Sequence, residues 1–142
     1  EITNYPFGER GSITHKPNKS FLNALGEEGI RKMVSDFYDL LYVSEIKDLF
    51  PSDEKSFAMA KKHSADFFIQ LCGGPDYFNQ SRGAPRMAGR HMAFKITPSA
   101  RIVWLNCYKQ IVLDLDISDE LKITFWKYLD VFSNWMVNTP ED

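Results

Sequence analysis

The sequence predicts an all-α fold, and three observations support that prediction. Apolar residues recur with helical spacing in four long stretches, so each stretch presents one apolar stripe. Signals for β-strands are weak throughout the chain. The 142 residues, of which 44% are hydrophobic and 14% aromatic, suit one domain with one sizeable core. We therefore expect four long helices in two pairs, with an irregular segment between the pairs.

The N-terminal residues have the character of an extended arm. They include Pro6, Gly8, Gly11 and Pro17 among scattered charges, and they show neither a helical nor a strand period. We therefore expect residues 1–19 to form an N-terminal extension and residues 20–142 to form a single domain.

Two long helices are expected after this arm. Apolar residues spaced by three and four positions form a stripe on the first helix, and polar residues and Pro51 end it. Ser52 or Asp53 offers an N-cap for the second helix, and Gly73-Gly74-Pro75 stops it. The first stripe is Ile30, Met33, Val34, Phe37 and Leu41, and the second is Phe57, Ala60, Ser64, Phe67, Phe68 and Leu71.

The second pair of helices follows an irregular segment. Prolines and glycines interrupt residues 75–98, which leaves room only for short helices and loops. Pro98 can open a third long helix, because its missing N–H costs little in the first turn. Ser118 is the expected N-cap of a fourth helix, which carries a stripe of large apolar residues.

Charge and composition exclude several classes of protein. The 17 Lys and Arg residues against 19 Asp and Glu residues give a net charge of −2, so we expect no nucleic-acid partner. No apolar run is long enough to span a bilayer, and we expect no membrane association and a cytoplasmic location. Cys72 and Cys107 lie inside apolar stretches without metal-ligand spacing, which favours buried thiols.

Four side chains are candidates for chemistry. His91 has apolar neighbours on both sides, so it is either a haem-iron ligand or a histidine that packs or caps a helix. Tyr38 and Trp104 each combine an apolar body with one donor, so each either hydrogen-bonds a diatomic ligand or is a core aromatic. His63 follows two lysines and either lies on a solvated basic face or contacts haem propionates.

The spacing of several motifs resembles that of the truncated haemoglobins, the 2-on-2 globins, and specifically their group II. This resemblance implies a globin-like 2-on-2 helical sandwich that binds haem b, and it covers about residues 21–138. The motifs are Phe37-Tyr38, Leu49-Phe50-Pro51, Phe67 to Gly73-Gly74-Pro75, Tyr77 to Pro85-Arg86, Arg90-His91 with Phe94, Trp104-Leu105-x-Cys107 and Met136-Val137-Asn138.

The resemblance also implies roles for individual residues. His91 matches the proximal iron ligand, Tyr38 the tyrosine on the distal side, and Trp104 the tryptophan that covers the distal pocket. Phe50 matches the aromatic residue that stacks against the porphyrin, where many members of group II carry a tyrosine. The other residues expected around the haem are Ala60 at the distal gate, Ser64 facing the ligand, His63 at the haem edge, and Phe67, Met87, Phe94, Ile96 and Val103 along the walls.

The loop after Pro51 is about two residues longer than in typical relatives. This difference leaves a second alignment open, in which His63 binds the iron directly. The resemblance thus implies one obligatory ligand, His91, and two possible positions for His63.

Three functions are compatible with these features. The first is a haem protein that binds O2 and carries out redox chemistry on NO, peroxide or related species, as an NO dioxygenase or peroxidase would under nitrosative or oxidative stress. It would need a separate reductase, because the sequence has no flavin or nicotinamide motif. The second is an O2 sensor or store without turnover. The third is a haem-free helical interaction module in which His91 is structural.

Overall fold

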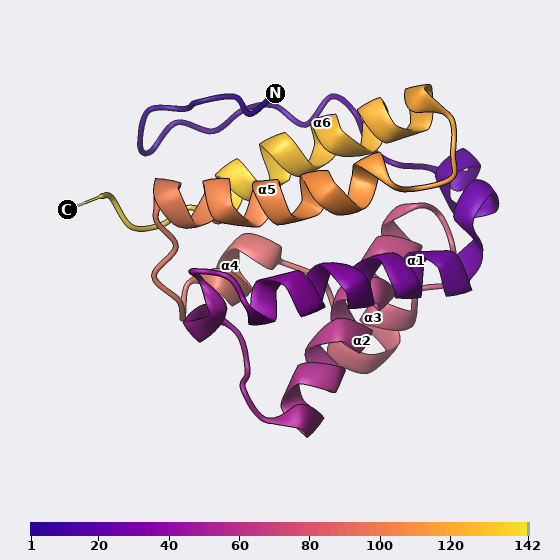
Figure 1. Ribbon diagram of the computed structural model, residues 1–142, viewed down its shortest axis with the longest axis horizontal. Helices are drawn as coiled ribbons and strands as arrows, with labels where there is room; N and C mark the ends of the chain where they lie inside the picture. The colour runs from indigo at the N-terminus through magenta and orange to yellow at the C-terminus, as the bar shows by residue number, and fades with distance from the viewer. Residues whose placement is uncertain (142) are drawn as a thin grey trace.

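The computed structural model describes residues 1–141, and the helices in this part of the chain form two layers (Figure 1). One layer holds α1 (Lys19–Tyr42), α2 (Glu54–Leu71) and the short α3 (Tyr77–Arg82). The other holds α5 (Pro98–Leu113) packed against α6 (Asp119–Met136). The remaining elements are a 3-10 turn, η1 (Lys47–Leu49), and a single short helix, α4 (Met87–His91). This arrangement confirms the predicted all-α fold of two helix pairs with short helices between them.

Local signals set most of the helix boundaries. The Asp53 carboxylate accepts a hydrogen bond from the backbone N–H of Ser56, and the Ser118 hydroxyl accepts one from Leu121, so both residues cap their helices. Thr97 caps α5, and Pro98 occupies its first turn. These three starts lie where the sequence predicts them. Within α1, Gly26 adopts a φ of 74°, a left-handed conformation that kinks the helix and that glycine tolerates best.

Aromatic rings fill the space between the two layers. The rings of Phe37 on α1 and Tyr108 on α5 stack with their centroids 3.5 Å apart. Phe21 stacks on Phe125 of α6 at 4.6 Å, and Phe125 in turn contacts Phe68 of α2. These contacts tie α1 and α2 to α5 and α6, since such pairs contribute beyond the apolar area they bury.

The N-terminal arm lies along α5 and α6 rather than extending away from the domain (Figure 1). Two tryptophans of α6 hold it, because the Trp126 indole donates to the Glu1 carbonyl at 3.0 Å and the Trp135 indole donates to the Gly11 carbonyl at 2.7 Å. The Asn134 side chain accepts from the N–H of Gly11 and donates to the carbonyl of Glu9. The sequence predicts an extended arm but does not predict this docking surface. Helix α1 begins at Lys19, the last residue assigned to the arm from the sequence.

No helix in the described part of the chain is both long enough and apolar enough to cross a membrane.

Candidate functional site

A cavity of about 360 Å³ lies between the two layers and receives side chains from every α-helix. It brings together all the site residues expected from the sequence except Val103. That valine precedes Trp104 on α5 and is half-buried, but it does not line the cavity. The expected residues that line it are Tyr38, Phe50, Ala60, His63, Ser64, Phe67, Met87, His91, Phe94, Ile96 and Trp104.

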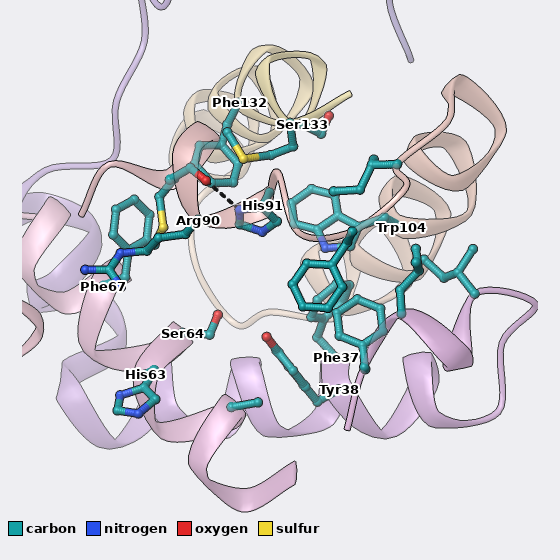
Figure 2. A pocket seen from close by; sticks show the side chains of 18 of the residues that line it. Phe37, Tyr38, His63, Ser64, Phe67, Arg90, His91, Trp104, Phe132 and Ser133 are labelled. Atoms are coloured by element: carbon teal, nitrogen blue, oxygen red, sulfur yellow. Dashed lines mark hydrogen bonds between the residues drawn. The ribbon is translucent and has the colours of Figure 1, made fainter. Parts of the chain in front are cut away.

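His91 closes α4 and presents its imidazole to the cavity (Figure 2). Its Nδ1 lies 2.7 Å from the carbonyl oxygen of Met87, one helical turn earlier. Because a carbonyl can only accept, Nδ1 carries a proton, and in the neutral imidazole the lone pair is then on Nε2. The geometry therefore prepares Nε2 to bind a metal.

Arg90 fixes the loop that leads into α4. Its guanidinium donates to three backbone carbonyls, those of Arg82 at 2.7 Å, Ala84 at 3.0 Å and Pro85 at 2.6 Å, and it lies over the ring of Phe78. Charge-assisted bonds of this kind order a loop whose residues are mostly exposed. In the Arg90-His91 motif, the arginine thus has a structural role, because it orders the loop that precedes the helix carrying His91.

Two hydroxyl groups face His91 from the other side of the cavity (Figure 2). Tyr38 comes from α1 and Ser64 from α2, and both point into the same space. Burial raises the pKa of the Tyr38 phenol, and the polar Ser64 hydroxyl offsets part of that rise. The phenol is therefore neutral at neutral pH and keeps a proton to donate. Its ring is held by edge contacts with Phe50 and Phe57.

Trp104 forms one side of the cavity. Its ring meets Phe37 edge-on at 5.5 Å and Tyr108 at 4.9 Å, so the aromatic core fixes the orientation of the indole. Trp104 therefore adds a rigid N–H donor to the cavity that the two hydroxyl groups also line.

His63 lies on α2 at the edge of the cavity (Figure 2). Its buried Nδ1 has no hydrogen-bond partner among residues 1–141. Burial lowers the pKa of His63, and the positive charges of Arg82 and Lys62 lower it further. The imidazole is thus neutral at neutral pH, with one nitrogen left to interact with a bound group.

Sequence reasoning missed four polar residues of the cavity wall, namely Arg82, Arg90, Arg101 and Ser133. Arg101 precedes Trp104 by three positions on α5, and residues with that spacing share one face of a helix. This spacing is a signal that would have placed Arg101 in the wall. Ser133 follows Phe132 on α6, and no local pattern distinguishes it from other serines.

The cavity has the features that a haem requires. Its lining is mostly aromatic and aliphatic, it has an imidazole with a free Nε2, and the unpartnered nitrogen of His63 lies at its edge. An apolar slot with one axial histidine is the ordinary protein environment of haem iron.

A family model for bacterial-like globins matches residues 20–138. The chain belongs to this family. Globins bind small diatomic ligands on a haem, and membership supports the same general activity here. The predicted resemblance to group II truncated haemoglobins is also confirmed, because a relative from Bacillus subtilis and a solved structure from Bacillus anthracis, both described next, carry that name.

Two known globins are similar to this one in sequence. The group 2 truncated haemoglobin YjbI of Bacillus subtilis is 30% identical over 119 residues, which cover 83% of this chain and 88% of the relative. The two-on-two haemoglobin-3 of Arabidopsis thaliana is 30% identical over 114 residues, which cover 77% of this chain and 63% of the relative.

Solved structures agree with these relatives. Phosphate-bound Hell's gate globin IV superposes with a TM-score of 0.86 at 35% identity, covering 97% of this chain and 84% of that one. The group II truncated haemoglobin of Bacillus anthracis gives a TM-score of 0.79 at 27% identity, covering 86% of this chain and 93% of that one. The helical sandwich of this globin is therefore that of the truncated haemoglobins.

Proposed function

We propose that this globin binds haem b through His91 and holds O2 in a polar distal pocket for redox chemistry on NO, peroxide or related species. One observation carries the proposal. An imidazole with a free Nε2 faces the Tyr38 and Ser64 hydroxyl groups across a single apolar cavity (Figure 2).

The chain offers separate groups to hold each part of the haem. His91 would bind the iron, Phe50 and Phe67 would pack against the porphyrin, and the unpartnered His63 nitrogen would meet a propionate. When bound, the haem supplies the iron that binds diatomic molecules and exchanges electrons with them. The protein would orient the haem, set the polarity around the bound ligand and control the access of ligands to the iron.

Three donors would act on a small polar ligand. Tyr38 and Ser64 offer hydroxyl groups and Trp104 an indole N–H, all on the cavity wall. A neutral hydrogen bond contributes about 0.5–1.5 kcal/mol net, so each donor would slow release of O2 by roughly 2- to 10-fold. Slow release is poorly suited to transport and favours chemistry on the bound ligand.

Turnover on this scheme requires electrons from another protein. The sequence has no flavin or nicotinamide motif, so we infer a separate reductase. Cys72 and Cys107 are free thiols, which supports a reducing compartment such as the cytoplasm.

His91→Gly tests the assignment of the iron ligand. We expect the variant to lose haem more readily, and we expect added imidazole to restore the five-coordinate ferrous spectrum, because imidazole replaces the missing side chain. Iron coordination that is the same with and without the substitution would contradict the assignment and would favour a structural role for His91.

Stopped-flow O2 dissociation tests the distal donors. Tyr38→Phe and Trp104→Phe should each speed dissociation by roughly 2- to 10-fold, and their effects should not add if they serve one ligand. Matched controls are Tyr42→Phe, at the exposed end of α1, and Trp126→Phe, whose indole binds the arm. Unchanged rates in both distal variants would refute the polar-pocket mechanism.

Turnover with a reductase separates chemistry from storage. The redox function predicts sustained consumption of NO or peroxide when the reduced protein is supplied with electrons. Binding of O2 without consumption would instead favour a sensor or store.

A further inference from the structure

The short helix that carries His91 has little packing of its own. Helix α4 spans five residues, and none of its side chains is fully buried. Its packing partner is α6. A helix this short is marginal by itself, so its position depends on side chains that reach it from elsewhere.

Asn138 reaches it from the segment after α6. Its Nδ2 donates to the carbonyl oxygen of His91 at 3.1 Å and to that of Phe94 at 2.8 Å. Its Oδ1 accepts from the backbone N–H of Ile96 at 3.0 Å, and its own N–H donates to the carbonyl of Ile96 at 3.0 Å. One side chain therefore fixes the whole turn that follows the imidazole.

The chemistry of the amide suits this arrangement. Both Nδ2 hydrogens meet carbonyl oxygens and Oδ1 meets an N–H, so the opposite orientation of the amide would lose all three bonds. The Met87 carbonyl fixes the His91 ring, while Asn138 fixes the His91 backbone. Together they fix the direction in which Nε2 points.

We propose that Asn138 is a positioning residue for His91, one that sets the tilt of the imidazole toward the iron. The inference rests on the proposed function, because it takes His91 to be the iron ligand. Asn138 itself does not line the cavity within the described chain, so it acts through the α4 backbone.

The test compares three variants of the haem-loaded protein. Asn138→Ala removes all the side-chain bonds. Asn138→Asp keeps the size and an acceptor for Ile96, but it loses both donors and turns a carboxylate toward two carbonyl oxygens. Asn134→Ala is the matched control, since Asn134 also makes side-chain bonds to backbone groups, but to the arm instead of α4.

Resonance Raman spectra of the five-coordinate ferrous protein provide the main measurement. We expect the iron–histidine stretching band to shift and broaden in Asn138→Ala and Asn138→Asp and to stay in place in Asn134→Ala. Transfer of haem to an apomyoglobin acceptor should be roughly 2- to 10-fold faster in both Asn138 variants, the effect of losing one or more hydrogen bonds. If the alanine variant does not fold, the aspartate variant still gives both readouts.

The outcomes separate the two inferences. A wild-type band that is retained without change in the Asn138 variants would overturn the positioning role and leave the haem assignment intact. An equal shift in Asn134→Ala would also overturn it, because general loosening would then explain the effect. A wild-type protein with no iron–histidine band would overturn the proposed function and, with it, the positioning role.

Discussion

Arg101→Met should destabilise this globin more than any surface substitution, because Arg101 joins three parts of the fold. The guanidinium lies on α5 and is only 6% exposed. It donates to the Asp130 carboxylate and carbonyl of α6, each at 2.7 Å, to the Ser133 hydroxyl at 3.0 Å, and to the Thr3 carbonyl of the arm at 2.8 Å. It also lies 5.5 Å from the centre of the Tyr5 ring.

The magnitude follows from what the substitution leaves behind. Burial lowers the pKa of Arg101, and Asp130 opposes that shift, so the two charges are desolvated together. Methionine fills much of the same space but leaves the Asp130 carboxylate with the Thr3 N–H as its remaining donor in residues 1–141. Breaking one partner of a buried pair costs about 3–5 kcal/mol, and we expect a loss of that size in the free energy of unfolding.

Urea unfolding of the haem-loaded protein, followed by circular dichroism, measures this loss. Arg10→Met is the matched control, since Arg10 is an exposed cation of the arm that lies over the Trp135 ring. In the double variant Arg101→Met/Asp130→Asn, removal of the isolated charge should restore part of the stability. A cost for Arg101→Met no larger than that of Arg10→Met would refute the reasoning.

Three further predictions concern single groups. Burial alone would raise the pKa of Asp66, but Lys62 and Arg31 outweigh it and hold the pKa below its ordinary value. The stability that Asp66 contributes is therefore present above its unfolded pKa of about 3.9 and lost as the pH falls through the lower folded pKa. When the free energy of unfolding is measured against pH, Asp66→Asn should reduce the loss of stability at acid pH. An unchanged loss would contradict the assignment of this stability to Asp66. Tyr108→Phe should raise stability by about 1 kcal/mol, because the buried hydroxyl has no partner in the described chain, and a clear loss in urea unfolding would show that it has one in solution. His63→Leu should speed haem loss without changing the ferric spin state, whereas a low-spin wild-type spectrum that this variant abolishes would place His63 on the iron.

Much of the helical framework could be predicted because its causes are local. Apolar stripes with a spacing of three and four residues define a helix face, and caps such as Asp53 and Ser118 depend on atoms within a few residues of each other. Spacing along α5 also carries the information that Arg101 shares a face with Trp104. The roles of Tyr38 and His91 were predicted from the resemblance of ordered motifs, because a lone histidine or tyrosine has no local mark of its function.

Only the tertiary structure decided the contacts between residues that lie far apart in the chain. Thr3 meets Arg101 across 98 positions, and Asn138 meets His91 across 47. Sequence periodicity predicts which face of each helix is apolar, but not which polar atoms come within 3 Å once the helices pack, since that depends on every crossing angle and loop between them. The docked arm, the buried Arg101 and the support of α4 by Asn138 therefore follow from the packing of the two layers.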